Sequence, residues 1–357
     1  MSPTSANQYW YEEVDTSFKP ARLIQMTRTA DVLVKNTLEL KPGEEVCIVT
    51  DTEISPLVYY AIAGAVKAAG GIPQIVMMEP LSVPSAEPPR AIAAAMIECD
   101  FLINCCSRSI THSRAAHEAY LERGIRYVVM SNVTEDRMLR GAATADFDIV
   151  RDISRKTCDA LNAGSKVRVT TPAGTDVTFD TAGRPFSGYY GKFEDGATAT
   201  VFPGGEVNTT PNEDSGNGRI VIDSFMMEVG LVQEPIVWDL KEGKITSITG
   251  GAEAHELERI LDTRGDEFSR FIGELSVGTN YAARSIGSSF EDKEVYGAVH
   301  IACGTGVHAA NGSWRARYQS SLHLDGVMSG PTVTVDGRDV VKDGEILAAP
   351  RPTSDRL

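Results

Sequence analysis

Short apolar runs alternate with segments of helical period along the first part of the chain. The runs are continuously apolar, which is typical of parallel strands buried on both faces. We expect strands at 44–51, 72–78, 100–106 and 125–132, and helices at 54–71, 84–100, 113–124 and 147–164. These elements predict an N-terminal α/β domain, a doubly wound parallel sheet, over residues 1–165.

The pattern changes at residue 166 to alternating apolar and polar positions separated by tight turns. Such alternation predicts antiparallel strands with one face on a core. Strand pairs are expected at 166–186, 219–227, 235–251 and 331–347, and helical segments at 252–265 and 266–273. The second part is therefore predicted to be a mostly antiparallel α+β domain over residues 166–357.

Composition and charge exclude several classes of function. Apolar residues make up 42% and charged residues 23% of the chain, as in an ordinary globular protein. The 34 basic and 49 acidic residues give a net charge of −15, which argues against nucleic acid and anionic membranes as partners. A bilayer-spanning apolar stretch and a signal-peptide pattern are both missing, and the six cysteines are scattered. We expect a cytoplasmic protein with free thiols.

The first part carries little that points to chemistry. The turn after the first predicted strand has no glycine-rich phosphate loop, which argues against a nucleotide domain. Asp51 and Glu53 in that turn could face a ligand, although a solvated turn is the preferred interpretation. His112 and His117 are interpreted as ordinary surface residues of a helix. This part is expected to be a scaffold.

Candidate metal ligands gather in the second part. His300 lies in one strand-like run, and His323 and Asp325 lie two positions apart in another, so these two point to one face. A polar face turned to solvent would show the same alternation. Glu206 follows a Pro-Gly-Gly turn, and Glu274 lies among apolar residues, where a buried carboxylate calls for a cation. An exposed helix end is the alternative for Glu274.

Four runs, FPGGEV, IGELSVGTN, VHIACG and LHLDGVM, resemble the aminopeptidase T (thermophilic leucyl aminopeptidase) family over about residues 165–350. The resemblance implies amide-bond hydrolysis of a peptide or small amide, two divalent ions (Zn, Co or Mn) and a homodimer. It implies these metal ligands: Glu206, Glu274, His300, His323 and Asp325. It also suggests that Glu206 bridges the ions, that Glu274 acts in addition as general base, and that Thr279 and Asn280 contact the substrate.

The chain departs from that family after VHIACG, the first of the two histidine-bearing runs. The aminopeptidases commonly carry a tyrosine shortly after the histidine of VHIACG, whereas here His308 follows. His308 is either a catalytic donor to the oxyanion or an ordinary loop histidine. Two loops, 183–196 and 312–319, could set specificity or form a dimer contact. Their prominent side chains are Tyr189, Tyr190, Trp314, Arg315 and Arg317.

A second function fits part of the same sequence. The runs PNEDS and HLD resemble the 2,5-dihydroxypyridine dioxygenases, which implies a mononuclear Fe(II) centre and ring cleavage. That resemblance implies a histidine where this chain has Glu274, and no counterparts of Glu206 and His300. The complete set of five ligands favours the hydrolase. It also disfavours a third hypothesis, a binding protein on an enzyme fold.

Overall fold

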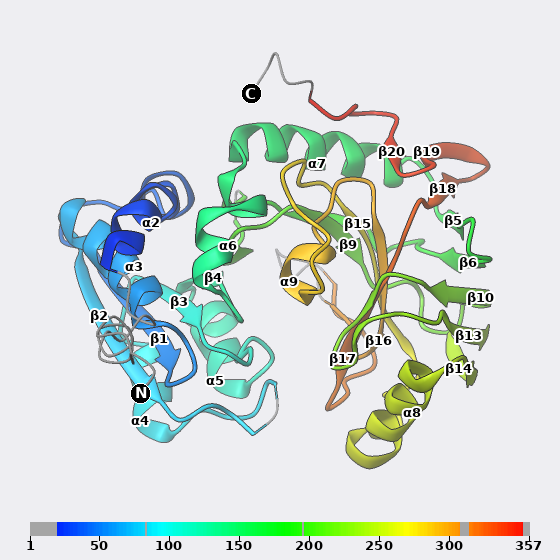
Figure 1. Ribbon diagram of the computed structural model, residues 1–357, viewed down its shortest axis with the longest axis horizontal. Helices are drawn as coiled ribbons and strands as arrows, with labels where there is room; N and C mark the ends of the chain where they lie inside the picture. Colours follow the sequence, from blue (N-terminus) through cyan, green and yellow to red (C-terminus); the bar gives the residue numbers. More distant parts are fainter. Residues whose placement is uncertain (1–19, 83, 195, 308–313, 353–357) are drawn as a thin grey trace, which may run out of the picture.

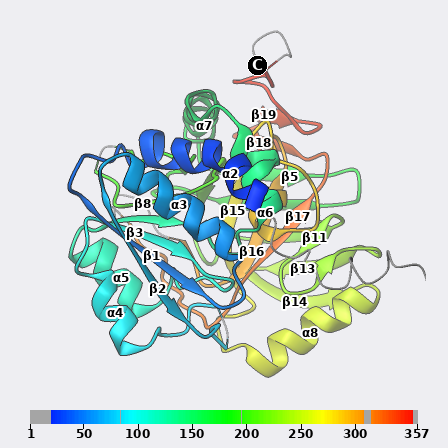
Figure 2. The same cartoon turned by 60° about the vertical axis from the view of Figure 1, so that its left-hand side comes forward.

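The computed structural model describes residues 20–352, apart from residues 83, 195 and 308–313. A parallel sheet lies on one side of the molecule, and antiparallel sheets lie on the other (Figures 1 and 2). None of the helices in the described residues has both the length and the apolar character needed to cross a bilayer. All six cysteines are free thiols, as expected from the sequence.

The parallel sheet has five strands and is covered by helices on both faces, as predicted. Its order is β2 (Ile72–Met78), β1 (Glu45–Asp51), β3 (Phe101–Cys105), β4 (Arg126–Val129) and β8 (Ala199–Val201). Val46 and Ile48 of β1 pack in one hydrophobic cluster, and Cys47 and Val49 pack in another on the opposite face. Because both faces are buried, the strands read as unbroken apolar runs.

Four of the six α-helices in the described residues of the first part were predicted and are shorter than expected, whereas the first and the fifth were not predicted. They are α2 (Pro20–Val32), α3 (Pro56–Ala68), α4 (Arg90–Met96), α5 (Arg114–His117), α6 (Glu135–Leu139) and α7 (Phe147–Leu161). The helix predicted at 84–100 begins only at Arg90, because two prolines precede it. Three short turns of other helix types complete the set: Leu33–Thr37, Glu118–Glu122 and Gly141–Thr144.

The chain returns to the parallel sheet after its first antiparallel hairpin. β8 pairs with β4 in parallel, with Tyr127 opposite Ala199 and Val129 opposite Val201. The first sheet is therefore completed by residues that lie beyond the boundary predicted at residue 165. Short, partly polar strands such as β8 carry little periodic signal, and the sequence did not predict it.

Two antiparallel sheets form the second part. The eight-stranded sheet runs β14 (Lys244–Thr249), β13 (Ile236–Lys241), β10 (Asn217–Ile222), β6 (Asp176–Asp180), β5 (Lys166–Thr170), β18 (Thr332–Val335), β19 (Arg338–Lys342) and β20 (Glu345–Ile346). The seven-stranded sheet runs β12 (Gly230–Leu231), β11 (Phe225–Met226), β17 (His323–Met328), β16 (Val299–Gly304), β15 (Ile272–Gly278), β9 (Glu206–Thr209) and β7 (Ser187–Tyr189). One hydrophobic core joins both sheets and includes α8 (Ala252–Arg264).

The helical segment predicted at 266–273 is wrong. Residues 267–270 form a turn, and β15 begins at Ile272. The Asp266 carboxylate accepts hydrogen bonds from the backbone N–H of Phe268 and of Ser321, so it stabilises a turn in competition with a helix. The remaining short helix, α9 (Ser289–Asp292), lies between the parallel sheet and the antiparallel sheets (Figure 1).

Candidate metal centre

Neighbouring strands β9, β15, β16 and β17 bring all five predicted metal ligands to one face of the seven-stranded sheet. Leu275 and Ile301 point into the hydrophobic core, whereas the residues that alternate with them point the other way. Glu274 pairs with Ala302, which pairs in turn with Asp325. Paired residues of antiparallel strands share a face. The prediction that His323 and Asp325 face a common site is therefore supported by the strand register.

Two groups of three ligands share Glu274. Glu206, Glu274 and His300 form one group, and Glu274, His323 and Asp325 form the other. Within each group, one ligand atom per residue lies within 4.8 Å of the others. Glu274 uses different oxygens, since Oε1 lies 3.4 Å from His300 Nε2 and Oε2 lies 3.0 Å from His323 Nε2. The groups are adjacent, and one carboxylate connects them.

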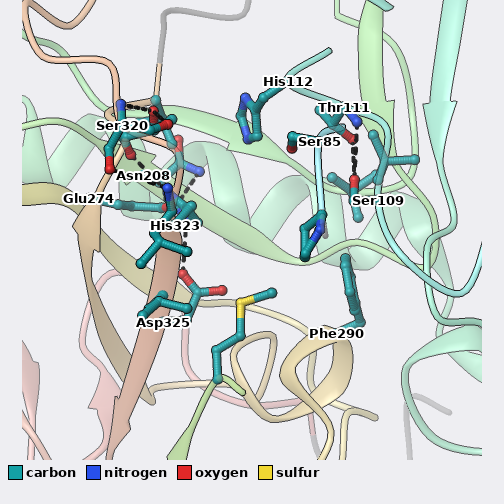
Figure 3. Close-up of a pocket in the computed structure, with 18 of the residues that line it drawn as sticks. Ser85, Ser109, Thr111, His112, Asn208, Glu274, Phe290, Ser320, His323 and Asp325 are labelled. Atoms are coloured by element: carbon teal, nitrogen blue, oxygen red, sulfur yellow. Dashed lines mark hydrogen bonds and ion pairs between the residues drawn. The ribbon is translucent and has the colours of Figure 1, made fainter. Parts of the chain in front are cut away.

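His323 is oriented by a backbone carbonyl so that its second nitrogen faces carboxylates. Its Nδ1 lies 2.8 Å from the carbonyl oxygen of Thr305, which can only accept, so Nδ1 donates. The Nε2 atom then faces Glu274 Oε2 at 3.0 Å and Asp325 Oδ1 at 3.1 Å (Figure 3). In a neutral ring this nitrogen is a lone pair directed at negative oxygens, an arrangement that fits a cation between them.

The electrostatics around His323 lead to the same conclusion. Burial acts to lower its pKa, but the carboxylates of Asp325 and Glu274 outweigh burial and hold the pKa well above its usual value. Burial likewise acts to raise the pKa of Glu274, but His300 and His323 hold it well below its usual value. The carboxylates thus attract a positive charge to this position, and a metal ion can take the place of that proton.

Several buried polar atoms at the site make no hydrogen bond of good geometry with the described residues, although some of them have ion-pair contacts. They include Glu206 Oε2, Asp325 Oδ1 and both ring nitrogens of His300, which is fully buried. Buried polar groups are rarely left in this state, since each lost hydrogen bond is costly. Oxygen and imidazole donors in this arrangement fit divalent ions such as Zn²⁺, Co²⁺ or Mn²⁺.

Buried negative charge exceeds buried positive charge around these ligands. Glu206, Glu274 and Asp325 are all buried. Glu294, fully buried next to Lys293 in the chain, adds little charge, because burial and Glu206 hold its pKa well above its usual value. The Lys293 ammonium lies 3.3 Å from Glu206 Oε2. Burial acts to lower its pKa, but Glu206 and Asp325 hold it well above its usual value. One ammonium against three ligand carboxylates leaves negative charge that divalent ions would neutralise.

Asn208 and Lys293 belong to the site although sequence reasoning missed both. The Asn208 side-chain amide donates to Glu274 Oε1 at 2.8 Å and to Glu206 Oε1 at 3.4 Å. It lies two positions after Glu206 in β9, so strand periodicity could have revealed that it shares a face with Glu206. Lys293 lies after α9, and its sequence surroundings carry no signal for its position.

A cavity of about 390 Å³ opens beside the ligands and has its opposite wall in the first part of the chain. Glu274, His323 and Asp325 lie on one wall, and Ser85, Ser109, Thr111 and His112 lie across from them (Figure 3). The ring centroids of His112 and His323 are 5.9 Å apart. The expectation that His112 is an ordinary helix residue is therefore wrong, and the first part is more than a scaffold.

The remaining predicted site residues lie elsewhere. Thr279 and Asn280 are fully buried after β15 and are not among the described residues that line the cavity. Thr279 Oγ1 is 2.6 Å from the Ser154 hydroxyl, and Asn280 Nδ2 donates to the carbonyls of Ala142 and Gly204. Their role as substrate contacts stays a prediction that these bonds do not favour. His308 lies outside the described residues.

The loop residues expected to form a specificity wall are divided between several places. Tyr189 lines the cavity, opposite Glu206 in the β7–β9 pairing. Tyr190 is buried in a core of the parallel sheet. Trp314 contacts the Arg184 guanidinium, whereas Arg317 pairs with Asp214 near the surface. Of these residues, only Tyr189 is placed by the described structure to meet a ligand in the cavity.

A sequence profile of the 2,5-dihydroxypyridine 5,6-dioxygenase family matches residues 30–348. The chain belongs to this family. Within it, the 2,5-dihydroxypyridine 5,6-dioxygenase of Pseudomonas putida KT2440 is 24% identical over 271 residues, which are 72% of this chain and 73% of the relative. From the sequence alone, the aminopeptidase T family was expected first and this family second, as its near relative; the match reverses that order.

Solved structures show that the fold is common to both groups of enzymes. The 2,5-dihydroxypyridine dioxygenase of Pseudomonas putida KT2440 superposes with a TM-score of 0.71 at 18% identity, over 91% of this chain and 98% of the other. Wild-type AmpT of Thermus thermophilus superposes with a TM-score of 0.66 at 16% identity, over 90% and 99%. The predicted fold class is confirmed. Because enzymes with different activities share this fold, the fold does not decide which reaction this chain catalyses.

Proposed function

We propose that this protein is a hydrolase that cleaves an amide bond in a small substrate with two divalent ions. The observation that carries the proposal is the pair of ligand groups that share Glu274 through different oxygens. One group consists of Glu206, Glu274 and His300, and the other of Glu274, His323 and Asp325. Zn²⁺, Co²⁺ and Mn²⁺ are the expected ions, since imidazole and carboxylate donors suit all three.

The centre supplies what amide hydrolysis needs. Divalent ions held here would polarise a carbonyl oxygen and lower the pKa of a water molecule. The cavity of about 390 Å³ suits a single-ring or dipeptide-sized substrate, because it lies at the lower end of the range for ligand sites. The homodimer implied by the resemblance stays a prediction.

The protein's own side chains orient the reacting groups and move protons. Asn208 fixes the Glu274 carboxylate through a 2.8 Å hydrogen bond. His300 and His323 hold the pKa of Glu274 well below its usual value against the effect of burial, which makes Glu274 a weak general base. His112 faces the centre from the opposite wall and is better placed to carry a proton to the leaving nitrogen.

Family membership favours a second candidate, a mononuclear Fe(II) dioxygenase that cleaves an aromatic ring. The matching family and the curated relative both carry that activity in their names. Glu274, His323 and Asp325 alone could hold one ion with open positions. This group has two carboxylates and one imidazole, whereas the usual oxygen-activating triad has the reverse ratio. The geometry therefore ranks the hydrolase first.

Metal content and reaction type together test the proposal. The purified protein is loaded with Zn²⁺, Co²⁺ or Mn²⁺ and assayed on aminoacyl anilides and small cyclic amides. In parallel it is loaded anaerobically with Fe(II) and assayed for oxygen uptake on 2,5-dihydroxypyridine. Two ions per chain with amide cleavage support the hydrolase. One iron per chain with oxygen consumed in step with the pyridine would overturn it.

A variant of Glu206 sharpens this comparison. Glu206 belongs only to the group without Asp325, so Glu206→Gln should abolish two-metal hydrolysis and leave a one-iron reaction largely intact. Glu256→Gln removes the same charge from the exposed face of α8, where Glu256 pairs with Arg259, and serves as the control. Full hydrolysis by Glu206→Gln would contradict the proposal.

A further inference from the structure

The two ligand groups differ in how much of their charge the protein already neutralises. Glu206 has an ammonium beside it, with Lys293 Nζ 3.3 Å from Oε2 and 3.4 Å from Oε1. In the same group, Glu274 Oε1 accepts a 2.8 Å hydrogen bond from Asn208. In the other group, Glu274 Oε2 and Asp325 Oδ1 lie next to the imidazole of His323, and the Lys293 ammonium interacts with Asp325 more weakly than with Glu206.

The Lys293 side chain is held in this position. Its backbone directly follows α9, and its neighbour Glu294 makes N–H and C=O bonds to Glu291 and Asn280. The Asp292 carboxylate binds three consecutive backbone N–H groups at residues 286–288, which fixes the preceding loop. The Lys293 side chain is only 12% exposed and lies near the Phe290 ring. Its ammonium therefore cannot turn into solvent without disturbing this loop.

We propose that Lys293 makes the two metal positions unequal, so that they fill in sequence. The position formed by Glu274, His323 and Asp325 binds the first ion tightly. Lys293 weakens binding of the second ion at Glu206, Glu274 and His300, because a fixed positive charge at the Glu206 carboxylate repels a dication at low dielectric. This inference rests on the proposed two-metal function and assigns Lys293 as a positioning residue.

The inference has a consequence for the state of the protein at limiting metal. A one-ion form would keep Lys293 as the counter-ion of Glu206, and the second ion would enter only at higher concentration. At limiting metal, the state of the protein then depends on how far the second position is filled. Binding of each ion, measured without substrate, is the direct readout.

Titration of the metal-free protein tests the proposal. Co²⁺ is added to the full-length chain after chelation and dialysis, and binding is followed by calorimetry and by the visible absorption of bound Co²⁺. The wild type should show two dissociation constants separated by about tenfold or more. Lys293→Met should tighten the weaker step by about 10- to 100-fold, the usual scale for residues that contact metal ligands. The tighter step should change less than the weaker one, because Lys293 interacts with Asp325 more weakly than with Glu206.

Matched variants assign the effect to the charge of Lys293. Lys293→Arg keeps the charge and should behave like the wild type. Lys35→Met removes a charge from a lysine that is 63% exposed and pairs with Asp31, and it should change neither step. Glu206→Gln should remove the weaker step, and Asp325→Asn the tighter one. Should Lys293→Met not fold, as judged by circular dichroism, Lys293→Gln takes its place.

Each outcome separates the inference from the proposed function. Two equal steps in the wild type, or an unchanged weaker step in Lys293→Met, would overturn the role of Lys293 and leave the two-metal hydrolase standing. One ion in the wild type but two in Lys293→Met would confirm that Lys293 opposes the second ion and contradict the hydrolase. One ion in both proteins would overturn both.

Discussion

Glu274 on β15 and Asp325 on β17 face each other across Ala302, the residue of β16 that pairs with both. Neighbouring strands are about 4.8 Å apart, so the two carboxylates start from backbones on either side of an intervening strand. Only a small side chain between them leaves room for the His323 Nε2 atom, 3.0 and 3.1 Å from their oxygens. Ala302 is fully buried and provides that room.

A larger residue at Ala302 should therefore displace the metal. We expect Ala302→Leu to lose the tightly bound ion and all activity, because the added side chain fills the space between the carboxylates. Cys303→Leu adds volume to the same strand on the core face and is the control. Both variants should lose about 1–3 kcal/mol of stability through overpacking. Metal analysis and chemical denaturation distinguish them, and retention of metal by Ala302→Leu would contradict the geometry.

Loss of the Asn208 amide should reduce activity without emptying the site. Its bonds to Glu274 and Glu206 orient both carboxylates, so Asn208→Ala should lower metal affinity or kcat/KM by about 10- to 100-fold. Asn217→Ala, on an exposed part of β10, is the matched control. Metal titration and steady-state kinetics provide the test. Wild-type values for Asn208→Ala would show that the amide is not needed for orientation.

His112 should affect turnover and not metal binding. It faces the centre from the opposite wall and is not part of either ligand group. We expect His112→Ala to lower kcat by about 10²- to 10⁴-fold, the range for a proton-transfer residue, with unchanged metal content. His255→Ala, on the exposed side of α8, should be silent. Loss of metal in His112→Ala would place this histidine among the ligands instead.

Chelation should destabilise the folded protein. Without ions, the carboxylates of Glu206, Glu274 and Asp325 repel each other at short range inside the protein. Ions present at about 1,000 times their dissociation constant stabilise the native state by about 4 kcal/mol each, so the Tm should fall by several degrees on chelation and recover on adding Zn²⁺ or Mn²⁺. Calorimetry gives the Tm. An unchanged Tm would indicate that these residues hold no ion.

The Glu213 carboxylate, which is not one of the candidate metal ligands, predicts a pH dependence of the folding stability. Burial acts to raise the pKa of Glu213, but the backbone N–H of Arg317 and the guanidinium of Arg184 lower it below its usual value. The stabilisation is thus present above about pH 4.3, the unfolded pKa, and is lost as the pH falls through the lower folded value. Glu213→Gln should cost about 1–3 kcal/mol at pH 7 and less at low pH.

Urea denaturation at pH 7 and below pH 4 measures this difference. Glu345→Gln, at an exposed strand position, controls for the loss of one charge. A cost for Glu213→Gln that stays constant down to the lowest pH would show that the contact acts through packing and not through charge.

The sequence predicted what depends on local alternation. His323 and Asp325 share a face because strand side chains alternate, and Glu274 is buried in a strand and not exposed at a helix end. The helix-like period of residues 266–273 misled because the Asp266 side chain binds backbone N–H groups there. In a short segment a helical pattern covers only about two turns, and side-chain hydrogen bonds to the backbone can then override it.

Contacts between distant segments could not be predicted in the same way. His112 and His323 meet only because the parallel sheet and the seven-stranded sheet pack against a common cavity, and nothing in the residues around His112 indicates this. Lys293 likewise reaches Glu206 through the path of a loop. The aminopeptidase T family was expected first for a similar reason, because the ligand motifs all lie in the second part and the first part offered no motif to compare.

The two walls of the cavity carry different kinds of residue: candidate metal ligands on one and small polar side chains on the other. The candidate metal ligands and the strands that carry them lie on one wall of the cavity, while Ser85, Ser109 and Thr111 lie on the opposite wall. Changes in the second set can retune which molecule is accepted without touching the catalytic machinery. A single architecture can in this way supply relatives that degrade quite different compounds.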